Sequence, residues 1–364
     1  MPSFTRPSEP IVGKIHIGLT DHIEGPRDRP TAAILGEVAE LVMLADRLGA
    51  RFAWFTEHHD HVHEGHLPTP LLLALHLAGQ THKIQLGTAI ICLNLHHPLD
   101  IAEQTAVADL LMRGRLAPGF GSGSTPGEFR LFGLAETADQ ERHARFAEAL
   151  AIIHDAWRGQ IGDSATDSSP EFFQVPAHRP LPVASADLWS RTWIAVNSVG
   201  SARIAGTLGL NMLFSHLRTP AQYRQYAETY RSAGGNGLIA ANRPVFVGPD
   251  DATAWAQAEP ALRRLWRRFQ AEGKIPADMP ESDQLPDLAG HPINFIIGGP
   301  ESVARQLREL WSFVPFDVAN VEVRWAGLDH DQVCDSMRRL MEQVMPLVNT
   351  HGQPALTLAR NSTA

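Results

Sequence analysis

The sequence predicts an α/β protein built as a single (β/α)8 barrel of the TIM type, with insertions, forming one domain over residues 1–364. Short apolar runs alternate with amphipathic stretches along the chain, and eight of these runs are candidate strands. A length of 364 residues is ordinary for a barrel that folds as one unit. A doubly wound open sheet is the second possibility.

Eight short segments are expected to form the strands, at residues 15–19, 52–56, 84–93, 116–120, 192–197, 211–215, 244–247 and 321–325. The third of these is apolar throughout, as a strand buried on both faces requires. Apolar residues at helical spacing predict helices over 34–48, 71–78, 98–111 and 146–157. Thr219 and Pro220 mark a later helix, with Thr as N-cap and Pro at the first helical position.

Two segments lack any periodicity. Residues 160–190 are rich in Ser, Asp and Pro and are expected to form a long connection. Residues 268–292 are polar and proline-containing, and we expect an irregular insertion near the carboxyl ends of the strands. Long irregular loops in a compact domain are often lids over a site.

Composition excludes some classes of partner. A net charge of −9 argues against a nucleic-acid-binding protein or one with a cationic membrane-binding surface. Cys92 and Cys334 do not form a disulfide framework or a CxxC motif. Residues 1–10 are polar, and the chain has no apolar run of membrane-spanning length, so we expect a cytoplasmic protein.

The stretch from Glu57 to His66, which directly follows the second predicted strand, is the densest set of polar groups in the chain. In a parallel barrel the carboxyl ends of the strands form the mouth of the active site. We therefore expect a catalytic role for His58, whereas each histidine after His59 is more simply interpreted as a polar loop residue. The spacing His59/His61 and His61/His63 also allows a metal-dependent barrel hydrolase as a minor alternative, although no ligand cluster follows later in the chain; we predict no metal site.

Two segments after strands four and five are candidate anion sites. The turn Gly119–Gly123 lets backbone amides approach a phosphate, although a tight barrel turn explains it equally. Asn197, Ser198 and Ser201 lie at the start of an expected helix, where N–H groups favour an anion; an ordinary Ser N-cap is as good an explanation.

Several motifs together resemble the bacterial luciferase-like family of flavin-dependent monooxygenases. They are residues 54–59 (WFTEHH), 86–90 (LGTAI), 97–99 (HPL) with 102–103 (AE), 109–116 (DLLMRGRL), 119–123 and 128–133 (EFRLFG). The resemblance is firm over about residues 50–150, thinner but continuous over 192–215, and weak beyond residue 216.

The resemblance implies site residues by position. His58 matches the catalytic histidine beside the flavin, and Ala89 and Ile90 match the third-strand end that lies against the isoalloxazine ring, where the family often has a non-proline cis peptide bond. Around the phosphate, the implied residues are Ser122, Gly123, Asn197, Ser198 and Ser201, with Arg142 or Arg145 supplying positive charge. Ser122 stands where luciferase has an arginine, and Asn197 replaces an acidic residue.

The resemblance further implies a two-component monooxygenase. A separate NAD(P)H:flavin reductase would supply FMNH2, which with O2 would form a C4a-peroxyflavin that oxygenates a small organic substrate. A homodimer is expected. An FMN- or coenzyme F420-dependent reductase on the same barrel is the main alternative, and a non-catalytic flavin-binding protein is a further one.

Overall fold

The computed structural model describes residues 14–59, 65–123, 125–134, 138–161, 171–215, 218–271, 281–290 and 294–350, together with residues 273, 275 and 278. The barrel strands among them are β1 (His16–Asp21), β2 (Phe52–Phe55), β3 (Gln85–Thr88), β4 (Ile91–Cys92), β5 (Leu116–Ala117), β6 (Gly119–Gly121), β7 (Trp193–Val196), β8 (Asn211–Phe214), β9 (Ile239–Val247) and β11 (Val318–Glu322).

All neighbouring strands in this sheet pair in parallel, in the order β4-β6-β7-β8-β9-β11-β1-β2-β3-β5. β3 continues into β4, and β5 continues into β6. Since β3 pairs with β5 and β4 pairs with β6, the two ends of the strand order are adjacent and the sheet closes on itself. The parallel sheet therefore curls into a TIM-type barrel, as the sequence predicted, and an open doubly wound sheet is excluded.

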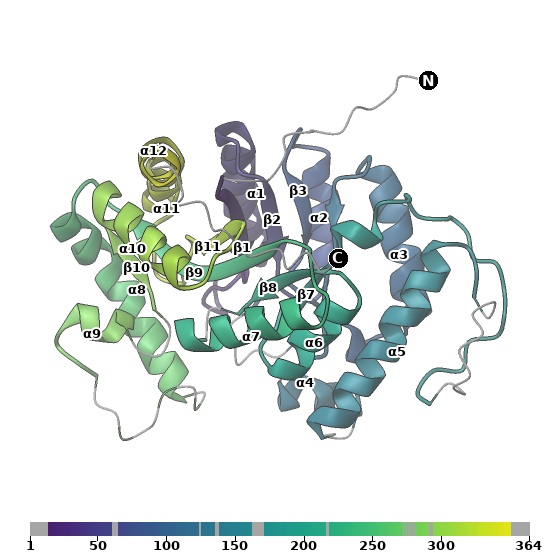
Figure 1. The fold of residues 1–364 in the computed structure, drawn as a ribbon. Helices are drawn as coiled ribbons and strands as arrows, with labels where there is room; N and C mark the ends of the chain where they lie inside the picture. Colours follow the sequence, from purple (N-terminus) through teal and green to yellow (C-terminus); the bar gives the residue numbers. More distant parts are fainter. Residues whose placement is uncertain are drawn as a thin grey trace, which may run out of the picture.

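Helices surround the sheet (Figure 1). They are α1 (Thr31–Leu48), α2 (Pro70–Ala78), α3 (Pro98–Leu111), α4 (Pro126–Leu131), α5 (Asp139–Trp157), α6 (Val199–Thr207), α7 (Pro220–Ser232), α8 (Asp251–Ala271), α9 (Leu285–Gly290), α10 (Pro300–Phe313), α11 (His330–Arg339) and α12 (Met345–Thr350). Short 3-10 turns lie at Leu93–Leu95 and Trp189–Arg191, and a π-helical turn joins α11 to α12 at Leu340–Val344.

Each predicted strand overlaps an observed one, but the seventh was placed too late. β9 begins at Ile239 rather than at residue 244, because the polar pair Asn242 and Arg243 interrupts the apolar run in the sequence. Arg243 is nevertheless buried, and its guanidinium donates to the carbonyls of Asn242 (2.8 Å) and Arg218 (3.1 Å). The short strand β10 (Ile296–Gly298), which pairs with β9, was not predicted.

The expectation of an irregular segment over 268–292 is wrong at two places. Residues 268–271 are the last turn of α8, and Leu285–Gly290 form α9. The missed signal is an apolar stripe at helical spacing in α8, which buries Leu262, Leu265, Trp266 and Phe269. Residues 272, 274, 276, 277, 279, 280 and 291–293 lie outside the described part of the chain.

Aromatic side chains fill the interior of the barrel. Trp54 is fully buried, stacks on Phe52 with ring centroids 4.7 Å apart, and meets the edge of Trp193 at 5.0 Å. Its indole N–H donates to the carbonyl of Ala117 at 3.2 Å. Leu213, near the end of β8, belongs to the same cluster, so this packing supports the carboxyl ends of the strands.

Glycines allow the third and fourth strands to approach closely. A Cβ on Gly87 would lie 1.7 Å from the carbonyl oxygen of Ala117, and one on Gly119 would lie 2.1 Å from that of Thr88. The Thr88 hydroxyl donates to the Gly119 carbonyl at 2.8 Å and accepts from its N–H at 3.0 Å. Directly after Thr88, the peptide bond between Ala89 and Ile90 is cis.

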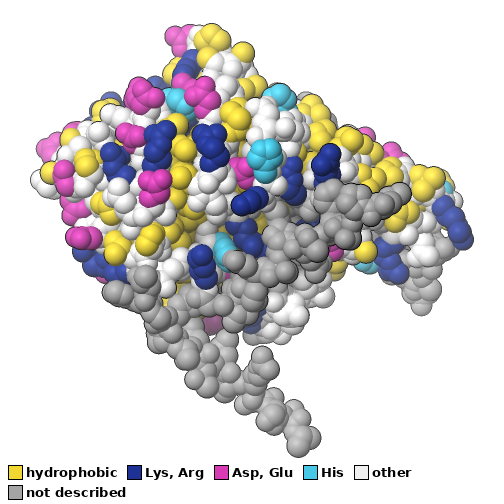
Figure 2. Space-filling view, turned by 90° about the horizontal axis from the view of Figure 1, so that it is seen from above, with side chains coloured by type: hydrophobic (Ala, Val, Ile, Leu, Met, Phe, Trp, Pro, Cys, Tyr) yellow, Lys and Arg dark blue, Asp and Glu magenta, His cyan; other side chains and the backbone are white. Residues whose placement is uncertain are grey.

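Two further observations concern the exterior. Basic and acidic side chains are interspersed on the face seen from above (Figure 2). Among the described residues, every helix is too short or too polar to cross a membrane.

A Gly119→Ala substitution is expected to destabilise the fold by about 1–3 kcal/mol, the usual cost of overpacking, because the new methyl group meets backbone rather than a movable side chain. Gly36→Ala is the matched control. It lies on the exposed side of α1 with open space around it and should instead stabilise by about 0.5–1 kcal/mol. Urea denaturation measures both, and equal effects of the two changes would contradict the close approach of the strands.

Candidate functional site

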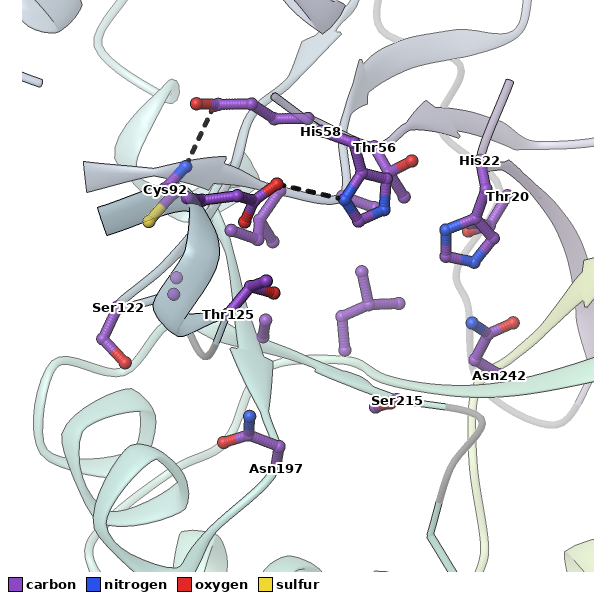
Figure 3. A pocket seen from close by; sticks show the side chains of 18 of the residues that line it. Thr20, His22, Thr56, His58, Cys92, Ser122, Thr125, Asn197, Ser215 and Asn242 are labelled. Atoms are coloured by element: carbon purple, nitrogen blue, oxygen red, sulfur yellow. Dashed lines mark hydrogen bonds and ion pairs between the residues drawn. The ribbon is translucent and has the colours of Figure 1, made fainter. Parts of the chain in front are cut away.

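A cavity of about 650 Å³ opens at the carboxyl ends of the barrel strands. Its volume is within the usual range for a small-molecule or cofactor site. Figure 3 shows side chains from several strand ends pointing toward one space, with His58 and His22 on one side and Asn197 and Ser122 on the other. Its position agrees with the location expected for the active site of a parallel barrel.

The structure brings together many of the predicted site residues but not all. His58, Ala89, Ile90, Ser122, Gly123 and Asn197 line the cavity. Ser198, Ser201, Arg142 and Arg145 do not. His61 and His63, which the metal alternative invoked, lie outside the described residues.

At the end of β2, Glu57 is a buried carboxylate that connects three segments. It accepts hydrogen bonds from the backbone N–H of Cys92 (3.1 Å) and from Nε2 of His59 (2.7 Å) and His96 (2.8 Å). Burial alone would raise its pKa, but these hydrogen bonds outweigh burial and lower the pKa of Glu57. The hydrogen bond to Glu57, opposed by partial burial, raises the pKa of His59.

His58 points into the cavity, whereas His59 is not among the residues that line it. Its Nδ1 lies 3.4 Å from Oε1 of Glu128, a buried carboxylate on α4. The same oxygen accepts the backbone N–H of His59 at 3.0 Å. Glu128 therefore fixes both the ring of His58 and the backbone beside it, a role that the sequence analysis missed.

A second histidine, His22, was also missed. It directly follows β1 and lines the cavity beside His58, with ring centroids 5.9 Å apart and planes inclined by 23°. Its Nε2 lies 3.0 Å from Oε1 of Glu322, the last residue of β11. Only its position in the sequence could have identified His22, because His22 and Glu322 each stand at the carboxyl end of a strand.

Glu57, His59 and His96 place ligand atoms within 4.8 Å of one another, as a metal ion would require. Both imidazoles already donate to Glu57, so this cluster is satisfied by its own hydrogen bonds. Its residues also come from only two neighbouring segments of the barrel, whereas a metal-dependent barrel hydrolase needs ligands from later strands as well.

On the opposite side of the cavity, two helices begin near Ser122. Ser198 and Ser201 form a capping box at the start of α6, with Ser198 Oγ accepting the N–H of Ser201 at 3.2 Å. Asn94 Nδ2 donates to the carbonyls of both Ser122 (2.9 Å) and Arg142 (3.0 Å), which holds the first turns of α5 beside the glycine-rich turn. The Ser N-cap is thus observed.

Two arginines of α5 have polar atoms that lack a partner. The Nε of Arg142 and the Nε of Arg145 are both buried without a hydrogen bond. Arg142 pairs with Asp139 at 2.6 Å, and the Arg145 guanidinium lies over the ring of Phe173 at 4.6 Å. A Cβ on Gly200, at the start of α6, would lie 3.0 Å from the ring of His143, so the two helix starts are in contact.

Comparison with known proteins identifies this arrangement. The family model of luciferase-like monooxygenases matches residues 15–314. The chain belongs to this family. Its relatives include the oxygenase component of a flavin-dependent trigonelline monooxygenase from Acinetobacter baylyi, 29% identical over 351 residues, which cover 89% of this chain and 93% of the relative.

Other relatives indicate the breadth of the family. An F420-dependent glucose-6-phosphate dehydrogenase from Nakamurella multipartita is 26% identical over 51% of this chain and 54% of its own length. The solved structure of monooxygenase RslO1 from Streptomyces bottropensis superimposes with a TM-score of 0.78 at 22% identity, over 92% of this chain and 99% of that one. These similarities establish a flavin- or F420-type oxidoreductase and confirm the fold.

The raised pKa of His59 predicts how its ion pair depends on pH. A His59→Gln variant keeps a donor to Glu57 but loses the charge. Its loss of stability relative to the wild type should be largest between the ordinary pKa values of 4.5 for glutamate and 6.5 for histidine. The loss should shrink as pH rises through the raised pKa of His59, because the native imidazole then becomes neutral.

Urea denaturation across a pH series measures this difference. The exposed His76→Gln on α2 serves as the control, and its effect should stay small at every pH. A His59→Gln effect that grows as pH rises would contradict the assignment.

Proposed function

We propose that this protein is the oxygenase component of a two-component monooxygenase, in which FMNH2 from a separate NAD(P)H:flavin reductase and O2 are used to oxygenate a small organic substrate. The observation that carries the proposal is His58, oriented by Glu128 and facing the cavity that Ala89 and Ile90 also line. Family membership and the flavin-dependent relative support it.

The residues present fit FMN. At one end of the cavity, the glycine-rich turn, Asn197 and the start of α6 offer backbone donors. We propose that Arg142 or Arg145, on the neighbouring α5, supplies positive charge from outside the lining, and Ser122 and Gly123 leave room because they are small. At Gly123 a side chain is excluded, since φ is +73° and a Cβ would lie 2.4 Å from the sulfur of Cys92.

Bound reduced flavin would supply the oxygen-activating chemistry, and the protein supplies position and protons. His58 can donate a hydrogen bond or accept a proton within the cavity, and Glu128 keeps its ring turned there. Arg268 and Phe269, at the end of α8, line the same cavity, and Arg268 pairs with Glu24 at 2.7 Å. We propose that this end of the 268–292 segment acts as part of a lid that excludes water.

We further propose a homodimer. The outer faces of α2 and α3 expose Leu72, Val107, Leu110 and Leu111, with Leu72 and Leu111 more than 60% accessible. The two helices contact each other. We propose that a second copy of the chain covers these side chains and that the protein acts in the cytoplasm.

The second candidate is an F420-dependent reductase, which the Nakamurella relative favours. Anaerobic titration with FMNH2 and with reduced F420 compares the two cofactors, and admission of air then tests for oxygen consumption. Tight binding of reduced F420 alone, without oxygen consumption, would favour the reductase.

His58→Ala is expected to fold and bind flavin but to lose most product formation, since general acid–base help is worth on the order of 10²–10⁴-fold in rate. Reduced flavin should then be spent on hydrogen peroxide. Coupled assays of product against peroxide measure this once a substrate is found. His59→Ala is the matched neighbour and should cost stability through Glu57 while leaving coupling largely intact. Full coupling in His58→Ala would overturn the role.

Replacing Ser198 and Ser201 together by Ala should weaken reduced-FMN binding by about 1–2 kcal/mol per hydrogen bond lost to a charged group. Helix capping must be separated from binding, because both serines also form the capping box of α6. Thr219→Ala removes the equivalent capping box of α7 and is the control, with a similar loss of stability and no loss of affinity. Unchanged affinity in the double serine variant would remove the phosphate assignment.

A further inference from the structure

His22 faces the same cavity as His58 but belongs to a separate hydrogen-bonded group. Figure 3 shows its ring beside that of His58, on the side of the cavity away from Asn197. Nε2 of His22 and Nδ2 of Asn242 both approach the same oxygen of Glu322, at 3.0 and 2.7 Å. Three adjacent strands, β1, β11 and β9, therefore hold this group together.

The carboxylate of Glu322 fixes how the two partners are turned. An ionised carboxylate can only accept hydrogen bonds, so each neighbour must direct a nitrogen that carries a proton toward it. The Nε2 edge of His22 is thereby committed to Glu322, and its other edge lines the cavity. A ring with one nitrogen fixed in this way presents its second nitrogen in a defined direction.

The surroundings of His22 favour its charged form. Burial lowers its pKa, but the charge and hydrogen bond of Glu322, with smaller contributions from Glu24 and Asp21, outweigh burial and raise it. The nearby cations are paired elsewhere, Arg268 with Glu24 and Arg324 with Asp21, both at 2.7 Å. Among the described residues, His58 is a further titratable group that faces the ring.

A small polar space adjoins this group. A second cavity of about 20 Å³, lined by His22, Glu24, Glu322, Arg268 and Arg324 among others, lies beside the main one. This volume suffices for about one water molecule with several polar partners. The imidazolium of His22 can therefore stay partly hydrated inside the barrel.

We propose that His22 is a second proton-transferring residue of this site, with Glu322 as its positioning residue. The proposal rests on the proposed function. During turnover, the cavity-facing N–H of the imidazolium gives its proton to a ligand oxygen that gains negative charge. The ring becomes a neutral imidazole that still donates from Nε2 to Glu322, and solvent returns the proton when the product leaves.

The experiment compares the wild type with His22→Gln, Glu322→Gln and the exposed control His76→Gln. Reoxidation of bound FMNH2 by O2 and release of hydrogen peroxide are followed by stopped flow across a pH series. In the wild type, the rate should fall as pH rises through a pKa above the ordinary 6.5 of histidine. His22→Gln should be at least about 10-fold slower and lack this pH dependence.

Glu322→Gln should keep the pH dependence but shift it to lower pH, because the neutral amide no longer stabilises the imidazolium. His76→Gln should match the wild type. Circular dichroism and FMN affinity confirm that each variant folds and binds. An independent readout is the titration of the His22 ring by NMR in the cofactor-free protein, where its pKa should lie above 6.5 and fall in Glu322→Gln.

An unchanged rate and pH profile in His22→Gln would overturn the proposal, as would a His22 pKa below 6.5. Failure of the proposed function looks different. In that case the wild type itself would not accelerate oxygen consumption by FMNH2, and the role of His22 would fall with it.

Discussion

The buried carboxylate of Glu57 is the constraint on which the arrangement of the site depends. It joins the end of β2 to the end of β4 and to His96, through one backbone N–H and two imidazoles. The hydrogen bond between Glu57 and His59 holds the chain on either side of His58, whose side chain lines the cavity. Burying the Glu57 carboxylate without hydrogen bonds would cost folding free energy. Each group that donates to Glu57 therefore also stabilises the fold.

The same principle recurs around the mouth of the barrel. His58 meets Glu128 from α4, and His22 meets Glu322 from β11, so each cavity histidine is paired with a carboxylate from a distant part of the chain. A carboxylate that binds one ring nitrogen determines which tautomer the other nitrogen presents. The cavity thus has its proton-active groups on one side and its helix starts and glycine-rich turn on the other (Figure 3).

Much of this could be predicted from the sequence, for identifiable reasons. Buried parallel strands are apolar runs, and polar residues that directly follow them, such as His58 and Asn197, are placed at the mouth by the fold itself. Glu128 could not be found this way, because its contact with His58 depends on how α4 folds back over the barrel, 70 residues along the chain. His22 follows its strand without a motif around it. The end of α8 was missed because polar residues flank its apolar stripe.

The division of the cavity bears on how one barrel can serve both oxygenases and reductases. The groups suited to a phosphate lie on the side of Ser122 and Asn197, and a nucleotide cofactor of either type could use them. What the protein does with the bound cofactor must then depend on the other side, where His58 and His22 stand 5.9 Å apart. Hydride transfer to a carbonyl and reduction of oxygen by a reduced flavin both require protons to move, so these two rings are compatible with either reaction.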